Sequence, residues 1–253
     1  MATDLSSLDP TGRFSERVDN YVKYRPSYPE ALLTFFREQF GLTHDHTITD
    51  VGAGTGIFAE LLLKNGYRVT CVEPNDAMRE ASVGQLSHYP GFSSVKGQGE
   101  ATGLASQSVD LITVAQAFHW MEPVATKKEF LRILKPGGHT ALIWNIRLQG
   151  SPFLVAYDKL KSDFGTDYST SGRDVRDTLI DFFAPAAMQL IIFPHQEKLT
   201  WEALKGQLLS ASYIPMPGHE RYDVMMGVLT ELFDTYQQDG TITMEYETKV
   251  YWA

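Results

Sequence analysis

The sequence predicts an α/β fold built on a doubly wound, mostly parallel sheet, and three features of the chain predict it. A short apolar run leads into three alternate glycines, and a helical pattern begins straight after them, which gives the order strand, glycine loop, helix. Apolar runs and amphipathic segments then alternate as far as residue 146. Residues 241–252 alternate strictly between apolar and polar side chains, which predicts a last, antiparallel strand with one wetter face.

The chain before the glycine loop is predicted to form an arm and a helix. The segment Tyr21–Pro29 is rich in tyrosine and proline, which predicts an extended aromatic stretch that either closes over a site or packs against the sheet. A helix is predicted over 28–40, with Ser27 and Glu30 at capping-box spacing. Arg25 has no helix face on which to be solvated, so we expect its guanidinium to face the site.

The glycine loop discriminates between ligands. A strand over 47–51 carries Asp50, the glycines Gly52, Gly54 and Gly56 follow, and a helix is predicted over 55–65. The dinucleotide fingerprint has the spacing G-x-G-x-x-G, whereas this loop has G-x-G-x-G. Asp50 would repel a pyrophosphate, but it suits a ligand that carries an ammonium group.

An acidic residue ends the next predicted strand. Glu73 closes the run 67–73, where a carboxylate accepts both hydroxyls of a ribose. The glycine loop, the ammonium partner and the ribose partner together predict S-adenosylmethionine, which has a ribose and an amino-acid tail but no phosphate. Pro74 then turns the chain into a helix whose first turn holds Met78, either against the adenine or in the core.

A polar loop follows the third predicted strand, 92–97, and consists of Gln98, Gly99, Glu100 and Ala101. A loop at the carboxyl end of a strand beside the glycine loop is well placed to bind an adenine edge. We expect the side chain of Gln98 or Glu100 to accept a hydrogen bond from the exocyclic amine, and one backbone N–H to donate to a ring nitrogen.

The fourth predicted strand, 108–115, is nearly all apolar, as expected for a central strand. It ends at Ala115, and Gln116, His119 and Trp120 follow at the edge where such sheets bind ligands. His119 is therefore a candidate site residue and, for a hydroxyl or amine acceptor, a candidate catalytic base. A helix over 123–134, a sharp turn at Lys135–Gly138 and a fifth strand over 139–146 follow.

The remaining segments have no fixed role in building the sheet, so we expect them to form a lid and an acceptor pocket. Helices are predicted over 152–164, 174–185, 200–213 and 219–237, and a sixth strand over 189–199. The chain is thus predicted to be one domain. Its parts are an arm and helix (1–40), a cofactor-binding core (41–146), lid and acceptor helices with the sixth strand (147–240), and a final strand (241–253).

Composition excludes several classes of function. The 253 residues carry a net charge of −9, which argues against a long nucleic-acid footprint but leaves room for a local basic pocket. No signal-peptide pattern and no membrane-spanning apolar run occurs, and the single cysteine, Cys71, fits a reducing compartment, so we expect a cytoplasmic protein without a membrane partner. No metal is expected, because the chain has no cysteine pair and His44 and His46 are predicted to lie in a solvated turn.

Several motifs resemble those of class I S-adenosylmethionine-dependent methyltransferases. They are the run Asp50-Val51-Gly52-Ala53-Gly54-Thr55-Gly56, the acidic Glu73 and the segment Leu134–Gly138. The pairing of Tyr24–Pro29 with Ala115–Trp120 resembles one small-molecule branch, the trans-aconitate methyltransferase-like proteins. The resemblance implies a seven-stranded sheet of order 3-2-1-4-5-7-6 in which only strand 7 is antiparallel.

The resemblance also implies roles for the site residues. Asp50 and the three glycines would hold the methionine moiety, Glu73 the ribose and residues 98–101 the adenine, while Gln116 would lie beside the methionine tail. Tyr21, Tyr24 and Trp120 are candidates to hold the sulfonium by cation–π contact.

We therefore expect an enzyme that transfers a methyl group from S-adenosylmethionine to a small-molecule acceptor and releases S-adenosylhomocysteine. A carboxylate acceptor needs no base but does need a cationic clamp, for which Arg25, Arg147 and Arg173 are the candidates. Two alternatives stay open: a non-catalytic regulatory module that binds S-adenosylmethionine, and a dinucleotide-dependent oxidoreductase, which the loop spacing and Asp50 oppose. We expect a monomer or a weak homodimer.

Overall fold

The computed structural model describes residues 23–166, 176–211 and 213–253, so Tyr21 and Arg173 lie outside the described residues. It confirms the predicted α/β fold, with a seven-stranded sheet in the order β3-β2-β1-β4-β5-β7-β6. Neighbours from β3 to β5 are parallel, whereas β7 is antiparallel to both β5 and β6. The strands are β1 (Thr47–Val51), β2 (Arg68–Val72), β3 (Phe92–Val95), β4 (Val109–Ala115), β5 (Leu134–Arg147), β6 (Gln189–Leu199) and β7 (Ile242–Trp252).

Two apolar layers cover the faces of the sheet, as its alternating side chains require. On one face, Ile48, Leu111 and Ile143 pack with α3 and α4, and on the other, Ile112, Val114 and Leu142 pack with α6 and α8. The described helices are α3 (Ala31–Phe40), α4 (Ile57–Lys64), α5 (Asp76–Leu86), α6 (Pro123–Ile133), α7 (Pro152–Phe164), α8 (Arg176–Phe183), α9 (Trp201–Leu209) and α10 (Tyr222–Tyr236).

The glycine loop turns as the sequence predicts. Gly52, Gly54 and Gly56 have φ angles of 69°, 57° and 87°, in the left-handed region that favours glycine. The N–H of Gly52 donates to the carbonyl of Val72 in β2 at 2.8 Å. A Cβ atom on Gly52 would lie 2.5 Å from the Cβ of Ala117, so the loop also needs glycine for space.

Two local predictions are wrong. Lys135–Gly138 lie inside β5 rather than in a turn before it, because β5 already pairs with β4 at Leu134 and again at His139, which leaves these four residues as an irregularity opposite Asp110. The capping box at Ser27 and Glu30 does not form, since α3 begins without a side-chain cap. The hydroxyl of Ser27 instead donates to Glu197 of β6 at 2.9 Å.

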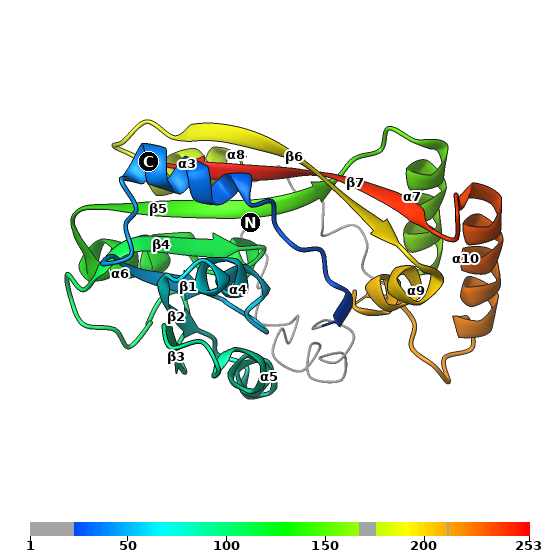
Figure 1. The fold of residues 1–253 in the computed structure, drawn as a ribbon, viewed down its shortest axis with the longest axis horizontal. Coiled ribbons are helices and arrows are strands. Elements are labelled where there is room, and N and C mark those ends of the chain that lie inside the picture. The colour runs from blue at the N-terminus through cyan, green and yellow to red at the C-terminus, as the bar shows by residue number, and fades with distance from the viewer. Residues whose placement is uncertain (1–22, 167–175, 212) are drawn as a thin grey trace.

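A second hydrophobic core lies away from the sheet faces. It joins α7, α9 and α10 to the end of β6 and the start of β7, through side chains such as Leu154, Leu208 and Leu229. Figure 1 shows these three helices beyond the carboxyl ends of β4 and β5. We call the described residues of 147–240 the lid half, and residues 41–146 the cofactor half.

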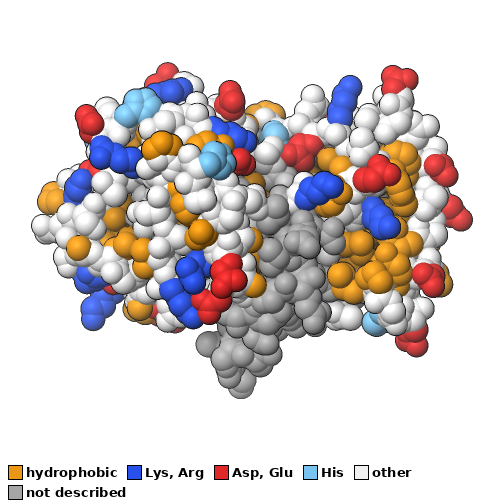
Figure 2. All heavy atoms as spheres, turned by 60° about the horizontal axis from the view of Figure 1, so that its bottom comes forward, with side chains coloured by type: hydrophobic (Ala, Val, Ile, Leu, Met, Phe, Trp, Pro, Cys, Tyr) orange, Lys and Arg blue, Asp and Glu red, His pale blue; other side chains and the backbone are white. Residues whose placement is uncertain are grey.

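The surface of the molecule mixes charge signs. On the face shown in Figure 2, basic and acidic side chains are interspersed, and apolar side chains gather over one end. Among the exposed large apolar side chains, Val155 of α7 and Val224 of α10 belong to the lid half. Within the described part of the chain, every helix is too short or too polar to cross a bilayer.

Candidate active site

The carboxyl ends of β1 and β2 bring two carboxyl groups to the glycine loop. Asp50 of β1 is 1% exposed, and its Oδ1 accepts a hydrogen bond from the Thr113 hydroxyl of β4 at 2.8 Å. Its Oδ2 is buried and has no hydrogen-bond partner among the described residues. Because an unsatisfied buried oxygen costs free energy, this atom favours a ligand that supplies a donor.

Burial also controls the protonation of Asp50. Burial raises the pKa of this carboxyl to about 7, the hydrogen bond from Thr113 lowers it, and the charge of Glu73 raises it again. A cation next to Oδ2 would favour the ionised form. The electrostatics of Asp50 therefore suit the ammonium partner that the sequence predicts.

Glu73, predicted to bind a ribose, follows β2 and also supports the glycine loop. Its Oε2 accepts the N–H of Gly54 at 2.8 Å, and its Oε1 accepts the N–H of Asn75 at 2.9 Å. Burial raises the pKa of the Glu73 carboxyl, while these two hydrogen bonds lower it. A carboxylate oxygen can accept two hydrogen bonds, so each Glu73 oxygen keeps a lone pair for a ribose hydroxyl.

The chemistry of these residues fits S-adenosylmethionine. The unsatisfied Oδ2 of Asp50 suits an ammonium, and the remaining lone pairs of Glu73 suit a ribose. A pyrophosphate would instead lie beside two buried carboxyl groups. The hydroxyl of Thr55, which the sequence did not single out, is also buried in the loop without a partner among the described residues.

Some polar groups of the loop after β3 hold the local structure, and one polar side chain stays exposed. Gln98 and Ala101 exchange backbone hydrogen bonds of 3.2 and 3.0 Å, which closes a tight turn. Glu100 Oε1 accepts the N–H of Glu122 at 2.6 Å and so holds the segment before α6. Gln98 is exposed and Gly99 is buried between them. This arrangement favours Gln98 over Glu100 as the side chain that meets an adenine amine.

The turn after β2 leads into α5. Pro74 is half-buried, and the side chain of Asn75 caps the helix by accepting the N–H of Met78 at 3.0 Å. Met78 is 3% exposed. Both of the roles predicted for Met78, in the core or against an adenine, require this burial.

The end of β4 bends sharply. Ala115 is half-buried, and Gln116 has a φ angle of 59°, which residues other than glycine rarely adopt. The N–H of Gln116 donates to Ile143, and its side-chain Nε2 donates to the carbonyl of Asn145 at 2.9 Å. Both partners lie in β5, so β5 holds Gln116 directly after the end of β4.

His119 lies in a short 3₁₀ turn, Phe118–Trp120, next to the Trp120 ring at 4.9 Å. The residue is solvent-exposed, yet partial burial of the ring and then the charge of Arg25 lower the pKa of its imidazole. His119 is therefore neutral at neutral pH. The shift also shows that Arg25, predicted as a site residue, lies within electrostatic range of His119.

The segment Tyr24–Pro29, which we call the strap, contacts both the lid half and the cofactor half. The Tyr24 ring lies directly over Gly206 of α9, where a Cβ atom would be 2.0 Å from the ring. Arg25 donates to the carbonyl of Ser210 at 3.3 Å, and Tyr28 packs edge-on against Phe58. The ring of Tyr24 therefore packs against α9.

Sequence reasoning named Arg147 but missed the side chains that surround it in the lid half. Arg147 at the end of β5 forms an ion pair with Asp158 of α7, and its guanidinium lies 5.0 Å from the centre of the Tyr157 ring. Lys161 of α7 lies 5.9 Å from the same ring and 5.4 Å from that of Tyr213. Tyr157 and Lys161, which sequence reasoning did not single out, are four positions apart on one helix, and this spacing was their only sequence signal.

These side chains of the lid half are electrostatically coupled to the strap. Burial lowers the pKa of Lys161 most. The charges of Arg147 and Arg25 lower it further, whereas the charge of Asp158 raises it. Burial raises the pKa of the Tyr157 phenol well above its ordinary value. Tyr246 of β7 donates to Gln207 Oε1 at 3.1 Å, and Arg147 and Arg25 also act on its pKa. The strap, β5, α7 and β7 thus bring their charged and phenolic groups to one region.

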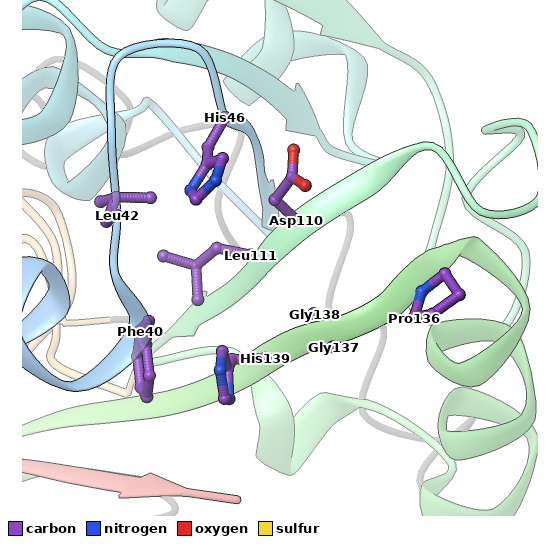
Figure 3. Close-up of a pocket in the computed structure, with 9 residues that line it drawn as sticks. All are labelled: Phe40, Leu42, His46, Asp110, Leu111, Pro136, Gly137, Gly138 and His139. Atoms are coloured by element: carbon purple, nitrogen blue, oxygen red, sulfur yellow. The ribbon is translucent and has the colours of Figure 1, made fainter.

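A separate hollow of about 170 Å³ lies at the opposite, amino edge of the sheet (Figure 3). It is lined by His46, Asp110, His139 and the irregular start of β5. Asp110 Oδ2 accepts from the N–H of Thr47 and from Lys135 Nζ, each at 2.7 Å, so this carboxylate has partners within the protein. The described residues hold no group of three or more potential metal ligands.

Comparisons with known proteins agree with this geometry. A family model described as a methyltransferase domain matches residues 49–142. An uncharacterized methyltransferase-like protein of Schizosaccharomyces pombe is 26% identical over 94% of this chain and 93% of its own length. An uncharacterized methyltransferase of Mycobacterium bovis is 33% identical over 56% of each chain.

Solved structures share the fold over most of the chain. A type II methyltransferase candidate from Anaeromyxobacter dehalogenans superposes with a TM-score of 0.62 at 19% identity, over 91% of this chain and 97% of its own. Phosphoethanolamine N-methyltransferase 2 of Haemonchus contortus, solved with phosphomonomethylethanolamine and S-adenosylhomocysteine, superposes with a TM-score of 0.57 at 13% identity, over 100% of this chain and 60% of its own.

Proposed function

The chain belongs to the class I S-adenosylmethionine-dependent methyltransferases, and from this premise we propose that it methylates a carboxylate oxygen of a small-molecule acceptor. One observation carries the proposal. The cofactor half presents the carboxyl groups of Asp50 and Glu73, whereas the lid half and the strap present the guanidinium groups of Arg147 and Arg25. A chain with a net charge of −9 thus places two cations where an acceptor would lie.

Arg147 is the strongest candidate for the acceptor clamp. One guanidinium nitrogen pairs with Asp158, while Nε is buried and has no hydrogen-bond partner among the described residues. A carboxylate oxygen would satisfy this N–H with a charge-assisted hydrogen bond. Arg25 approaches the same region from the strap, since it acts on the pKa values of Tyr157, Lys161 and Tyr246.

The reaction needs little from the protein beyond alignment. Bound S-adenosylmethionine supplies an electrophilic methyl carbon, so that an attacking oxygen forms the new C–O bond while the C–S bond breaks and its electron pair stays on sulfur. A carboxylate carries no proton to be removed, so no general base is required. The two arginines orient the acceptor, and the neutral His119 adds no competing charge. The lid half excludes water from the site.

The test is methyl transfer from radiolabelled S-adenosylmethionine to matched acceptors that share one carbon skeleton and differ only in a carboxylate, hydroxyl or amine. We expect label on the carboxylates, in a product that mild alkali hydrolyses to labelled methanol, because esters are alkali-labile. Arg25→Ala should raise the acceptor KM roughly 10- to 100-fold, the effect of losing one charge-assisted hydrogen bond. Arg25→Lys should lose less, because it keeps the charge.

S-adenosylhomocysteine titration provides the control for folding and for the cofactor half. Label only on amines or hydroxyls, in alkali-stable products, would overturn the carboxylate proposal while leaving the family assignment intact.

A further inference from the structure

Asn145 lies where β4 has ended but β5 continues. The last pair of these two strands is Ala115 with Ile143, whose carbonyl accepts the N–H of Gln116. Two residues further along β5, the carbonyl of Asn145 faces a position that β4 no longer occupies. The side chain of Gln116 fills it by donating Nε2–H at 2.9 Å. The bend of β4 at Gln116 therefore makes the backbone of Asn145 depend on this side chain.

The side chain of Asn145 reaches in another direction, to the strap. Its Nδ2 donates to the carbonyl of Ser27 at 2.8 Å, which fixes the orientation of the amide. Its Oδ1 accepts the hydroxyl of Thr248 at 2.6 Å, and Thr248 is the partner of Asn145 across the β5–β7 pair. One residue thus joins Gln116 through its backbone to the strap through its side chain.

The anchored part of the strap determines where Arg25 lies. Ser27 is held by Asn145 on one side and by Glu197 Oε1 on the other, through its N–H at 2.8 Å and its hydroxyl at 2.9 Å. Pro26 separates Ser27 from Arg25, and the proline ring restricts the backbone of both Pro26 and the residue before it. A stiff, two-residue link therefore connects the anchor to the Arg25 side chain.

We propose that Asn145 is a positioning residue that couples occupancy of the cofactor site beside Gln116 to the seating of the strap and of Arg25. A ligand that orders Gln116 also orders the carbonyl of Asn145, and with it the carboxamide that holds Ser27. Glu197 anchors the strap without any contact to Gln116, so it stabilises the strap but lies outside the coupling. The proposal rests on cofactor binding, and it does not depend on the carboxylate acceptor.

The test is hydrogen–deuterium exchange of the peptide that covers 24–30, with and without saturating S-adenosylhomocysteine. In the wild-type protein we expect the ligand to slow exchange of this peptide. In Asn145→Ala, exchange without ligand should rise roughly three- to tenfold, as expected for one lost hydrogen bond, and the ligand should no longer slow it. Titration calorimetry should show that the Kd for S-adenosylhomocysteine stays within about threefold, because the backbone carbonyl that Gln116 contacts remains.

Three further variants separate coupling from a merely structural role. Asn145→Asp keeps the shape and the acceptor for Thr248 but loses the donor to Ser27, so it should behave as Asn145→Ala. Glu197→Ala should speed exchange both with and without ligand, yet keep the slowing that the ligand causes. Asn65→Ala is the matched control, since the side chain of Asn65 bonds only the carbonyl of Leu61 on an exposed helix end.

Three outcomes would overturn the proposal. They are a wild-type peptide that does not respond to the ligand, a variant of Asn145 that keeps the wild-type response, and loss of S-adenosylhomocysteine binding in both variants of Asn145. The last would make Asn145 a support of the cofactor site itself rather than a link from it.

Discussion

The cofactor half and the lid half build their parts of the site in opposite ways. The cofactor half combines backbone groups with two buried carboxyl side chains: glycines with left-handed φ angles, N–H groups of Gly54 and Asn75, and the carboxyl groups of Asp50 and Glu73. The opposite side of the site uses long side chains from separate elements, with Arg147 and Lys161 of the lid half and Tyr246 of β7. The helices α7, α9 and α10 have a hydrophobic core of their own, whereas α8 packs on the sheet with the cofactor half.

The difference teaches how one fold serves a constant cofactor and a variable acceptor. A site framed by backbone groups is set by local conformation, so apart from its two carboxyl groups it changes little when side chains change. A site built from side chains on separate helices alters with each substitution, and specificity is free to vary there. Opposite charge in the two halves also suits a cationic cofactor and an anionic acceptor.

The largest effect is expected for Glu73→Ala, a substitution in the cofactor half. Loss of the carboxylate would remove the two ribose hydrogen bonds predicted for Glu73, and it removes the acceptor of the Gly54 and Asn75 N–H groups. Affinity for S-adenosylhomocysteine should fall about 10²- to 10⁴-fold, since hydrogen bonds to a charged group contribute about 1.5–3 kcal/mol each. Titration calorimetry measures this loss. A Kd within tenfold of the wild-type value would remove Glu73 from the ribose site.

The second effect concerns the protonation of Asp50. Its pKa of about 7 in the folded protein lies above the ordinary value, so between about pH 4 and 7 the folded state keeps a proton that the unfolded chain has lost. The free energy of unfolding should therefore fall as pH rises through this window, by up to about 4 kcal/mol. Urea unfolding at pH 5.5 and 8 measures the slope.

Asp50→Asn should flatten this pH dependence, because the amide does not titrate. The raised pKa of Glu73 also lowers the free energy of unfolding as pH rises, so part of the slope should remain in this variant. An unchanged slope in Asp50→Asn would show that Asp50 is ionised in the free protein at neutral pH.

The third effect tests the ion pair of the lid half. Arg147→Met should remove the paired guanidinium from the Asp158 carboxylate, whose side chain is 13% exposed and still accepts from Gln149 Nε2. We expect the free energy of unfolding to fall by about 2 kcal/mol, less than for a fully buried pair because water reaches both groups. The double variant Arg147→Met, Asp158→Leu should recover most of this loss in urea unfolding. Equal losses in the single and double variants would mean that the pair contributes packing rather than charge.

The smallest effect is expected for Tyr246→Phe. The variant removes the donor to Gln207 Oε1, while Gln207 Nε2 still donates to the carbonyl of Tyr24. Stability should fall by about 1 kcal/mol, the net contribution of one hydrogen bond, with no change in S-adenosylhomocysteine affinity. A matching loss of affinity would show that the two halves are not independent at this position.

Much of the cofactor half follows from the sequence, whereas the trans-aconitate-like branch and the roles of individual site residues stay predictions. The pattern predicted the glycine loop and the placement of Asp50 and Glu73 at one edge of the sheet, and the family resemblance implied the strand order. It failed at Lys135–Gly138, because proline and glycine normally end an element, while pairing with β4 kept these residues in β5. It also assigned Ser27 to a helix cap, because no local pattern shows that Glu197 lies nearby.

Sequence separation gives the physical reason for this division. The contact between Gly54 and Glu73 spans 19 residues, so one strand–loop–helix–strand unit brings them together and a motif records it. The contacts of the strap span far more: 118 residues from Ser27 to Asn145, 170 from Ser27 to Glu197 and 185 from Arg25 to Ser210. The sequence by itself therefore determined the cofactor half, through local backbone geometry and hydrophobic period. Only the tertiary structure decided which side chains of the strap, β5, α7 and β7 meet, because packing of the second core rather than any local pattern brings them together.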